Sequence, residues 1–137
     1  MNSGNPLNIS LTLAADAAAV GAALAAARGF AEAAGLAPDP ARRLAIVVEE
    51  LVANLVDHAG LNADDRIDLA LARHAGGVTL VLGDPAAPFD PRTAPLPADL
   101  PPAAGGGAGL ALVRAFAERI DYCSDGGRNR LEVRIAG

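Results

Sequence analysis

Residues 50–54 are Glu-Leu-Val-Ala-Asn, followed by His58-Ala59, and residues 105–114 are Gly-Gly-Gly-Ala-Gly-Leu-Ala-Leu-Val-Arg. A glutamate and an asparagine four positions apart share one side of a helix. The glycine run leads into an amphipathic segment, and the first backbone N–H groups of such a helix are available to an anion. Together the two segments indicate a site for a metal ion and a triphosphate.

The composition around these segments fits one domain with a core of small side chains. The chain has 137 residues, of which 52% are hydrophobic but only 3% aromatic, so Ala, Leu and Val must fill the interior. We expect a single domain over residues 1–137. The net charge of −5 makes the surface repel phosphate backbones, so no nucleic acid is expected among the partners.

Residue types that are missing exclude several chemistries. All 11 residues counted as Lys or Arg are arginine, and the absence of lysine excludes a Walker A loop and Schiff-base catalysis. Cys123 has no second cysteine for a disulfide, and the chain lacks the ligands for a Cys/His zinc site. Residues 1–10 do not resemble a signal peptide, and the apolar stretch 17–27 is shorter than the roughly 20 residues that span a bilayer. We therefore expect a cytoplasmic protein with no membrane segment.

A helix is predicted to carry the Glu50 and Asn54 pair. Asp39 is the expected N-cap, Pro40 the first helical residue, and the helix is expected to end near Gly60. Its apolar residues recur at helical spacing, and at about 100° per residue the pair then lies on a stripe beside the core. These apolar residues are Leu44, Val47, Val48, Leu51 and Leu55.

The other segments follow from alternation, helix propensity and turn residues. We expect strands at 7–13, 66–74, 78–82, 120–123 and 131–135, and helices at 16–35, with Asp16 as N-cap, and from Leu110 onward. Residues 85–107 are rich in Pro, Ala and Gly without periodicity, which is typical of a lid over a site. The order predicts an α/β (α+β) two-layer sandwich, with a mixed, mostly antiparallel sheet and helices on one face.

Each motif taken alone has a structural alternative. Glu50 and Asn54 fit a general base and an oxygen ligand for Mg²⁺, but they also fit a solvated helix edge. The glycine run fits phosphate binding or a linker, while a Rossmann motif fails because no strand precedes it. Asp84 follows the strand that ends at Leu82, where its carboxylate can accept a hydrogen bond from an adenine amino group or can simply form a Gly-Asp-Pro turn.

In this order and spacing, the three motifs resemble the GHKL-type (Bergerat) ATP-binding fold, and within it the anti-sigma-factor serine kinases related to RsbW and SpoIIAB. Residues 50–54 with His58-Ala59 resemble the N box of that family. Residues 84–91 resemble its G1 box, and residues 106–114 its G2 box. Residues 122–131 resemble its closing hairpin, so the likeness spans nearly the whole chain.

The resemblance implies a role for each matching residue. Glu50 is expected to be the catalytic base, Asn54 the Mg²⁺ ligand, and Asp84 the adenine-binding group. Gly107 and Gly109 would let the lid backbone wrap the triphosphate. The full set expected to contact ATP is Asn54, Asp84, Ala86, Phe89, Gly105, Gly106, Gly107, Ala108, Gly109 and Leu110.

The resemblance also implies a function and its partners. It predicts a Mg-ATP-dependent serine/threonine protein kinase that phosphorylates a serine on a STAS-domain anti-anti-sigma factor and regulates transcription by partner switching. A sigma factor would be the other partner, and the kinase would be a homodimer. The alternative is an ATP-binding anti-sigma or adaptor module without kinase activity, because Ala86 stands where the G1 box has its middle glycine. The catalytic half of a sensor histidine kinase is a weaker third hypothesis, since no phosphoacceptor-histidine helix is present in the sequence.

Overall fold

The computed structural model describes residues 7–93 and 107–137, and within them the chain forms five strands and three helices. In chain order these are β1 (Asn8–Ala14), α1 (Ala19–Ala33), α2 (Pro38–His58), β2 (Arg66–His74), β3 (Gly77–Asp84), α3 (Gly107–Phe116), β4 (Arg119–Asp125) and β5 (Arg128–Ala136).

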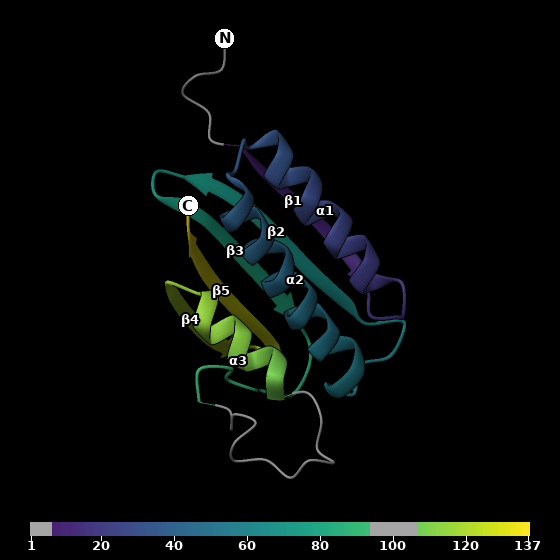
Figure 1. Cartoon of the computed structure of the whole chain (residues 1–137). Helices are drawn as coiled ribbons and strands as arrows, with labels where there is room; N and C mark the ends of the chain where they lie inside the picture. The colour runs from purple at the N-terminus through teal and green to yellow at the C-terminus, as the bar shows by residue number, and fades with distance from the viewer. Residues whose placement is uncertain (1–6, 94–106) are drawn as a thin grey trace.

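The strands form one sheet in the order β1-β2-β3-β5-β4, and the helices cover one of its faces (Figure 1). The predicted two-layer α/β sandwich is therefore confirmed. The sheet differs from the expected mixed type, because every pairing between the described strands is antiparallel. After β3 the chain crosses to β4 at the edge of the sheet, and β5 then fills the position between β3 and β4. Strand β5 runs antiparallel to both of these neighbours.

The core lies between the sheet and the helices, and it follows the period-two pattern of the strands. Alternate residues of the three central strands point toward the helices and are almost fully buried. They are Ile67, Leu69, Leu71, Val78, Leu80, Leu82, Leu131, Val133 and Ile135. Asp84 and Asn129 continue the same alternation at the ends of β3 and β5, so two polar side chains are buried on the apolar face.

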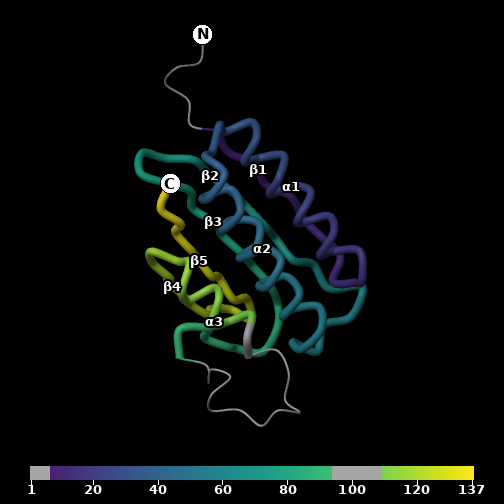
Figure 2. The backbone as a smooth tube through the Cα atoms, in the orientation of Figure 1, coloured from purple at the N-terminus to yellow at the C-terminus, as the bar shows by residue number. Residues whose placement is uncertain are grey.

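Helix α2 lies between α1 and α3 and packs against both (Figure 2). Toward the sheet it buries the apolar residues predicted for it at 44, 47, 48 and 51, together with Val52. Leu55 is only partly buried. Helix α1 packs through small residues such as Ala23 and Ala27, as the alanine-rich composition predicted.

Both predicted helix caps are wrong by a few residues. Helix α2 begins at Pro38 after the N-cap Ala37, so Asp39 lies in the first turn. There the Asp39 carboxylate pairs with Arg42 and Arg43, which competes with capping. The carboxylate of Asp16 accepts a hydrogen bond from the Ala18 N–H in a turn that precedes α1, and α1 itself begins at Ala19.

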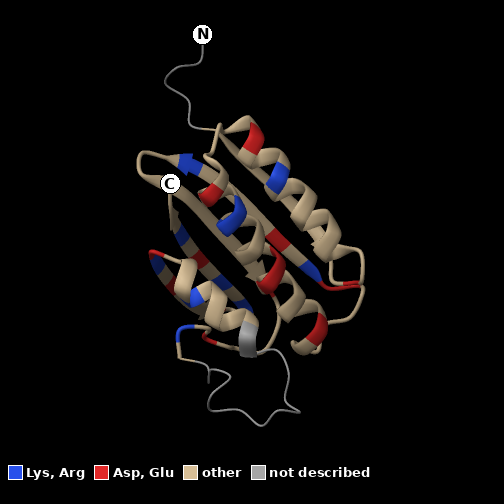
Figure 3. Ribbon diagram, viewed as in Figure 1, with Lys and Arg blue, Asp and Glu red and all other residues tan. Residues whose placement is uncertain are grey.

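Charged residues lie along the strands β4 and β5 and at intervals on α1 and α2 (Figure 3). On the uncovered face of the sheet they pair across strands, as between Arg128 and Asp68 at 2.6 Å. Among the helices of the described part of the chain, none has the length and apolar character needed to cross a membrane.

Candidate functional site

The second half of α2, the start of α3, the end of β3 and the start of β5 meet at one end of the molecule (Figure 1). Glu50 and Asn54 lie one helical turn apart on α2, and both are half-buried beside fully buried neighbours. Within the described residues, neither side chain takes part in a hydrogen bond or an ion pair. The two polar groups are thus placed at the edge of the core with their bonding capacity unused.

Gly109 on α3 lies directly against the side chain of Glu50. A methyl group built at position 109 would overlap the Glu50 carboxylate and would approach the Glu50 Cδ to 3.0 Å. Glycine inside a helix costs about 1 kcal/mol relative to alanine, so this close approach gives a physical reason for its presence. The contact brings together two residues that the sequence assigned to one site from motifs far apart in the chain.

Helices α2 and α3 run antiparallel, and contacts fix them at both ends. At the other end of α3, the guanidinium carbons of Arg42 and Arg43 lie 5.6 Å and 5.7 Å from the centre of the Phe116 ring. This distance is within the range of cation–π attraction. Seven residues separate position 109 from 116 and 43 from 50, so the two contacts bracket the same length of both helices. The start of α3 is therefore held beside Glu50.

Asp84 lies at the end of β3, only 6% exposed, opposite Asn129 of β5. Its Oδ1 atom accepts hydrogen bonds from the Ala86 N–H at 2.9 Å and from Asn129 Nδ2 at 2.9 Å. No described residue donates a hydrogen bond to its Oδ2 atom. The Oδ1 atom of Asp84 therefore accepts two hydrogen bonds within the protein, whereas Oδ2 can accept one from a bound ligand.

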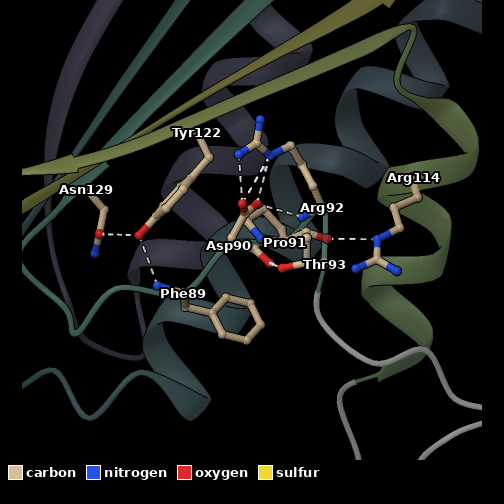
Figure 4. A network of polar contacts seen from close by, with 8 residues as sticks. All are labelled: Phe89, Asp90, Pro91, Arg92, Thr93, Arg114, Tyr122 and Asn129. Carbon is tan, nitrogen blue, oxygen red and sulfur yellow. Dashed lines mark hydrogen bonds and ion pairs between the residues drawn. The ribbon is translucent and has the colours of Figure 1, made fainter.

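Asn129 is buried to the same degree, and both the nitrogen and the oxygen of its side-chain amide form hydrogen bonds. Besides Asp84, Nδ2 donates to the Ala86 carbonyl at 2.8 Å, and Oδ1 accepts from the Tyr122 hydroxyl at 2.7 Å. Acceptors face the nitrogen and a donor faces the oxygen, so the amide has one chemically consistent orientation. The Tyr122 oxygen in turn accepts the Phe89 N–H at 3.0 Å (Figure 4).

Residues 90–92, which follow this network, form contacts with one another and with α3. The Arg92 guanidinium forms a bidentate pair with Asp90, with a shortest distance of 2.8 Å, and its hydrogen bonds hold the pKa of the Asp90 carboxyl below its ordinary value. Arg114 Nε donates to the Pro91 carbonyl at 2.7 Å (Figure 4). The Arg92 guanidinium is therefore engaged with Asp90.

The other residues expected to contact a nucleotide lie in different surroundings. Phe89 is 53% exposed, whereas Leu110, in α3, is buried. Gly107 and Ala108 form the first turn of α3. Gly105, Gly106 and most of the predicted lid fall outside the described residues.

Sequence analysis missed the roles of Asn129, Tyr122 and Arg114. A signal for Asn129 was present, because it occupies the inward position of the alternation Leu131, Val133, Ile135, where a polar residue needs an explanation. Nothing in the sequence linked Arg114 to Pro91, since 23 positions separate them.

Asp84, Glu50 and the first turn of α3 offer the groups that an adenine nucleotide needs: an acceptor for an amino group, a carboxylate and bare N–H groups. In the described residues no group of three His, Cys, Asp or Glu side chains is placed to hold a metal ion. A Mg²⁺ ion at Asn54 would therefore take most of its oxygen ligands from phosphates and water, as this ion commonly does.

Comparison with known proteins supports an ATPase fold of the histidine kinase type. The model of the histidine kinase-like ATPase domain family matches residues 13–135, so the chain belongs to that family, and the family implies ATP binding. No curated protein matches the chain.

Two solved structures share the fold at low sequence identity. The RsbU and RsbW domains of Rv1364c from Mycobacterium tuberculosis align over 95% of this chain with 17% identity and a TM-score of 0.66. This chain spans 32% of that longer chain. The SiaB–SiaC complex from Pseudomonas aeruginosa aligns over 96% of this chain and 91% of the other, with 17% identity and a TM-score of 0.64. The resemblance to this group of ATP-binding proteins is thus confirmed for the fold.

Proposed function

We propose that this chain is a Mg-ATP-dependent protein serine/threonine kinase that acts as a partner-switching regulator. The observation that carries the proposal is the contact of Glu50 with Gly109, which brings to the start of α3 a carboxylate that has no hydrogen-bond or ion-pair partner among residues 7–93 and 107–137. The family match adds ATP as the nucleotide. The acceptor is a serine on a STAS-domain anti-anti-sigma factor, a sigma factor is the second partner, and the kinase works as a homodimer of single-domain chains.

Each residue has one task in this proposal. The Oδ2 atom of Asp84 accepts a hydrogen bond from the adenine amino group, and the first N–H groups of α3 bind phosphate oxygens. The amide oxygen of Asn54 is a ligand for Mg²⁺. When bound, Mg-ATP supplies the phosphoryl group and the charge neutralisation that this transfer requires.

Glu50 acts on the acceptor serine. Its carboxylate orients the serine hydroxyl and accepts the hydroxyl proton as the serine oxygen bonds to the γ-phosphorus and the bond to ADP breaks. Its position beside the first turn of α3 keeps it next to the bound phosphates. The products are ADP and the phosphoserine form of the partner.

Transfer of radioactive phosphate tests the kinase. The protein is mixed with Mg-ATP labelled at the γ-phosphate and with a candidate STAS-domain partner, after binding of the two proteins has been verified. We expect the label on a serine of the partner. Stable binding without any label on the partner contradicts the kinase proposal.

An ATP-binding adaptor without kinase activity is the second candidate. Ala86 favours it, because this residue replaces a glycine of the G1 box and both of its backbone groups are already bonded, the N–H to Asp84 and the carbonyl to Asn129. The same experiment separates the candidates when calorimetry accompanies it. Binding of ATP without phosphoryl transfer supports the adaptor, whereas binding with transfer supports the kinase.

A further inference from the structure

Asn129 and Tyr122 hold the one carboxylate assigned to adenine, although neither residue was assigned to the site. They are brought together by strand register, because Asp84 pairs with Asn129 across β3 and β5, and Ser124, two residues beyond Tyr122, pairs with Asn129 across β4 and β5. Three neighbouring strands thus place the three side chains in one chain of hydrogen bonds. A sheet fixes such positions more firmly than a loop does.

The bonds to Asn129 decide which way the Asp84 carboxylate faces. Oδ1 receives two donors, while Oδ2 receives none from the described residues. Rotation of the carboxylate would break both bonds in a site that is only 6% exposed, where an unmade hydrogen bond is costly. Asp84 therefore presents a single acceptor in a fixed direction.

Tyr122 supports this arrangement from the other side of Asn129. Its hydroxyl donates to Asn129 Oδ1 and accepts from the Phe89 N–H, so it joins β4 to the segment that follows Asp84 (Figure 4). Removing the hydroxyl would leave both the amide oxygen and the Phe89 N–H without these partners. The Asn129 amide would then be free to tilt, and Asp84 would follow it.

We propose that Asn129 and Tyr122 are positioning residues that make Asp84 selective for a 6-amino purine over a 6-oxo purine. This inference rests on the proposed function of the site. A fixed Oδ2 meets the amino group of ATP but opposes the 6-oxo group of ITP. A carboxylate released from Asn129 is able to turn toward the N1–H of ITP, so the preference falls.

Calorimetric titration with ATP and with ITP, each with excess Mg²⁺, tests the inference. For the wild type we expect ATP to bind at least about tenfold more tightly than ITP, the effect of roughly one well-placed hydrogen bond to a charged group. For Asn129→Ala we expect the ratio to fall to within about threefold, mainly through weaker ATP binding. Tyr122→Phe should give an intermediate ratio.

Controls separate positioning from folding. Asn62→Ala alters an exposed turn and should leave the ratio at the wild-type value. If ATP and ITP binding weaken equally in Asn129→Ala and Tyr122→Phe, or if the ratio stays unchanged, the inference is overturned while the proposed function stands. Should Asn129→Ala fail to fold, the conservative Tyr122→Phe decides alone. A folded wild type that binds neither nucleotide overturns the proposed function and this inference with it.

Hydrogen exchange gives a test that needs no nucleotide. The amide of Phe89 donates to Tyr122, and its side chain is exposed, so little else shields it. We expect Tyr122→Phe to speed exchange at Phe89 by about tenfold or more, while amides in the middle of β5 keep their rates. Unchanged exchange at Phe89 contradicts the link between Tyr122 and this segment.

Discussion

The two halves of the candidate site differ in how their polar groups are held. At the end of β3 and the start of β5, Asp84, Asn129 and Tyr122 are joined by hydrogen bonds, and Asp84 and Asn129 are each 6% exposed. On the edge of α2, the Glu50 and Asn54 side chains have no such bonds to the described residues. In the proposed site, the group that would recognise adenine is held in place by hydrogen bonds before binding. The groups proposed to act on the metal ion and the acceptor serine have no such partners among the described residues.

Among substitutions that test this difference, Glu50→Gln should have the largest effect, which is on the rate of phosphoryl transfer. The amide keeps the size of the side chain but accepts a proton poorly, so we expect phosphoryl transfer to fall by about 10²–10⁴-fold while ATP affinity stays near the wild-type value. Glu49→Gln is the matched control, because Glu49 is exposed on the same helix. The rates are measured in single-turnover transfer to the partner protein. Equal rates for Glu50→Gln and the wild type would remove Glu50 from its role.

Gly109→Ala should come next, because it moves the Glu50 carboxylate without removing it. The new methyl group overlaps the flexible end of the Glu50 side chain, which can shift at little cost to folding. We expect transfer to slow by about 10–100-fold, since small misplacements of a catalytic group are costly. Stability should stay the same or rise by up to about 1 kcal/mol.

Gly29→Ala provides the control for that change. Gly29 lies on α1, where an added methyl group meets nothing within 4 Å. It should gain a similar stability by thermal unfolding and leave transfer unchanged. A Gly109→Ala protein that transfers phosphate as fast as Gly29→Ala would show that the close contact with Glu50 has no role in catalysis.

Asn54→Ala should have a smaller effect, and one that depends on the metal. Loss of one amide oxygen from the ion is expected to weaken binding of Mg-ATP by about tenfold, while binding of ATP measured in EDTA changes little. Calorimetry with and without Mg²⁺ gives the two affinities, and Asn62→Ala is again the control. A loss of equal size in EDTA would show that Asn54 contacts the nucleotide itself.

Removing the ion pair of Asp90 and Arg92 should have the smallest effect, a change in thermal stability whose dependence on pH follows from the pKa of Asp90. The hydrogen bonds from Arg92 lower the pKa of Asp90 in the folded protein, so the pair stabilises the fold above the ordinary value of 3.8. This contribution is lost as pH falls below 3.8 and through the lowered pKa. We expect Asp90→Asn to lower the melting temperature slightly at pH 7 and less at pH 3. A difference that grows on acidification would contradict this assignment.

Local patterns were sufficient to predict most of the fold. Alternation along 66–74 and 78–82 and helical spacing along α2 depend on nearby residues only, and the structure places these elements within a few positions of the expected bounds. The predicted cap at Asp39 was wrong because Arg42 and Arg43 lie within reach of its carboxylate, and the predicted cap at Asp16 was wrong because that carboxylate bonds the Ala18 N–H in a turn before α1. A simple capping rule contains neither interaction.

The candidate site was predictable only in part, for a physical reason. Glu50 and Asn54 share a helix, so their spacing was enough to group them. The bond between Asn129 and Asp84 joins residues 45 positions apart and depends on the register of β3 against β5, which the sequence does not state. The contact of Gly109 with Glu50 likewise depends on how α3 packs against α2.

Titration of the wild type and of Asp84→Ala with Mg-ATP tests the central claim most directly. We expect one nucleotide to bind per wild-type chain. The Asp84→Ala protein, once shown to be folded, should bind Mg-ATP with at least about tenfold lower affinity. A wild type that takes up no adenine nucleotide at millimolar concentration, or an Asp84→Ala protein that binds it equally well, would contradict the account.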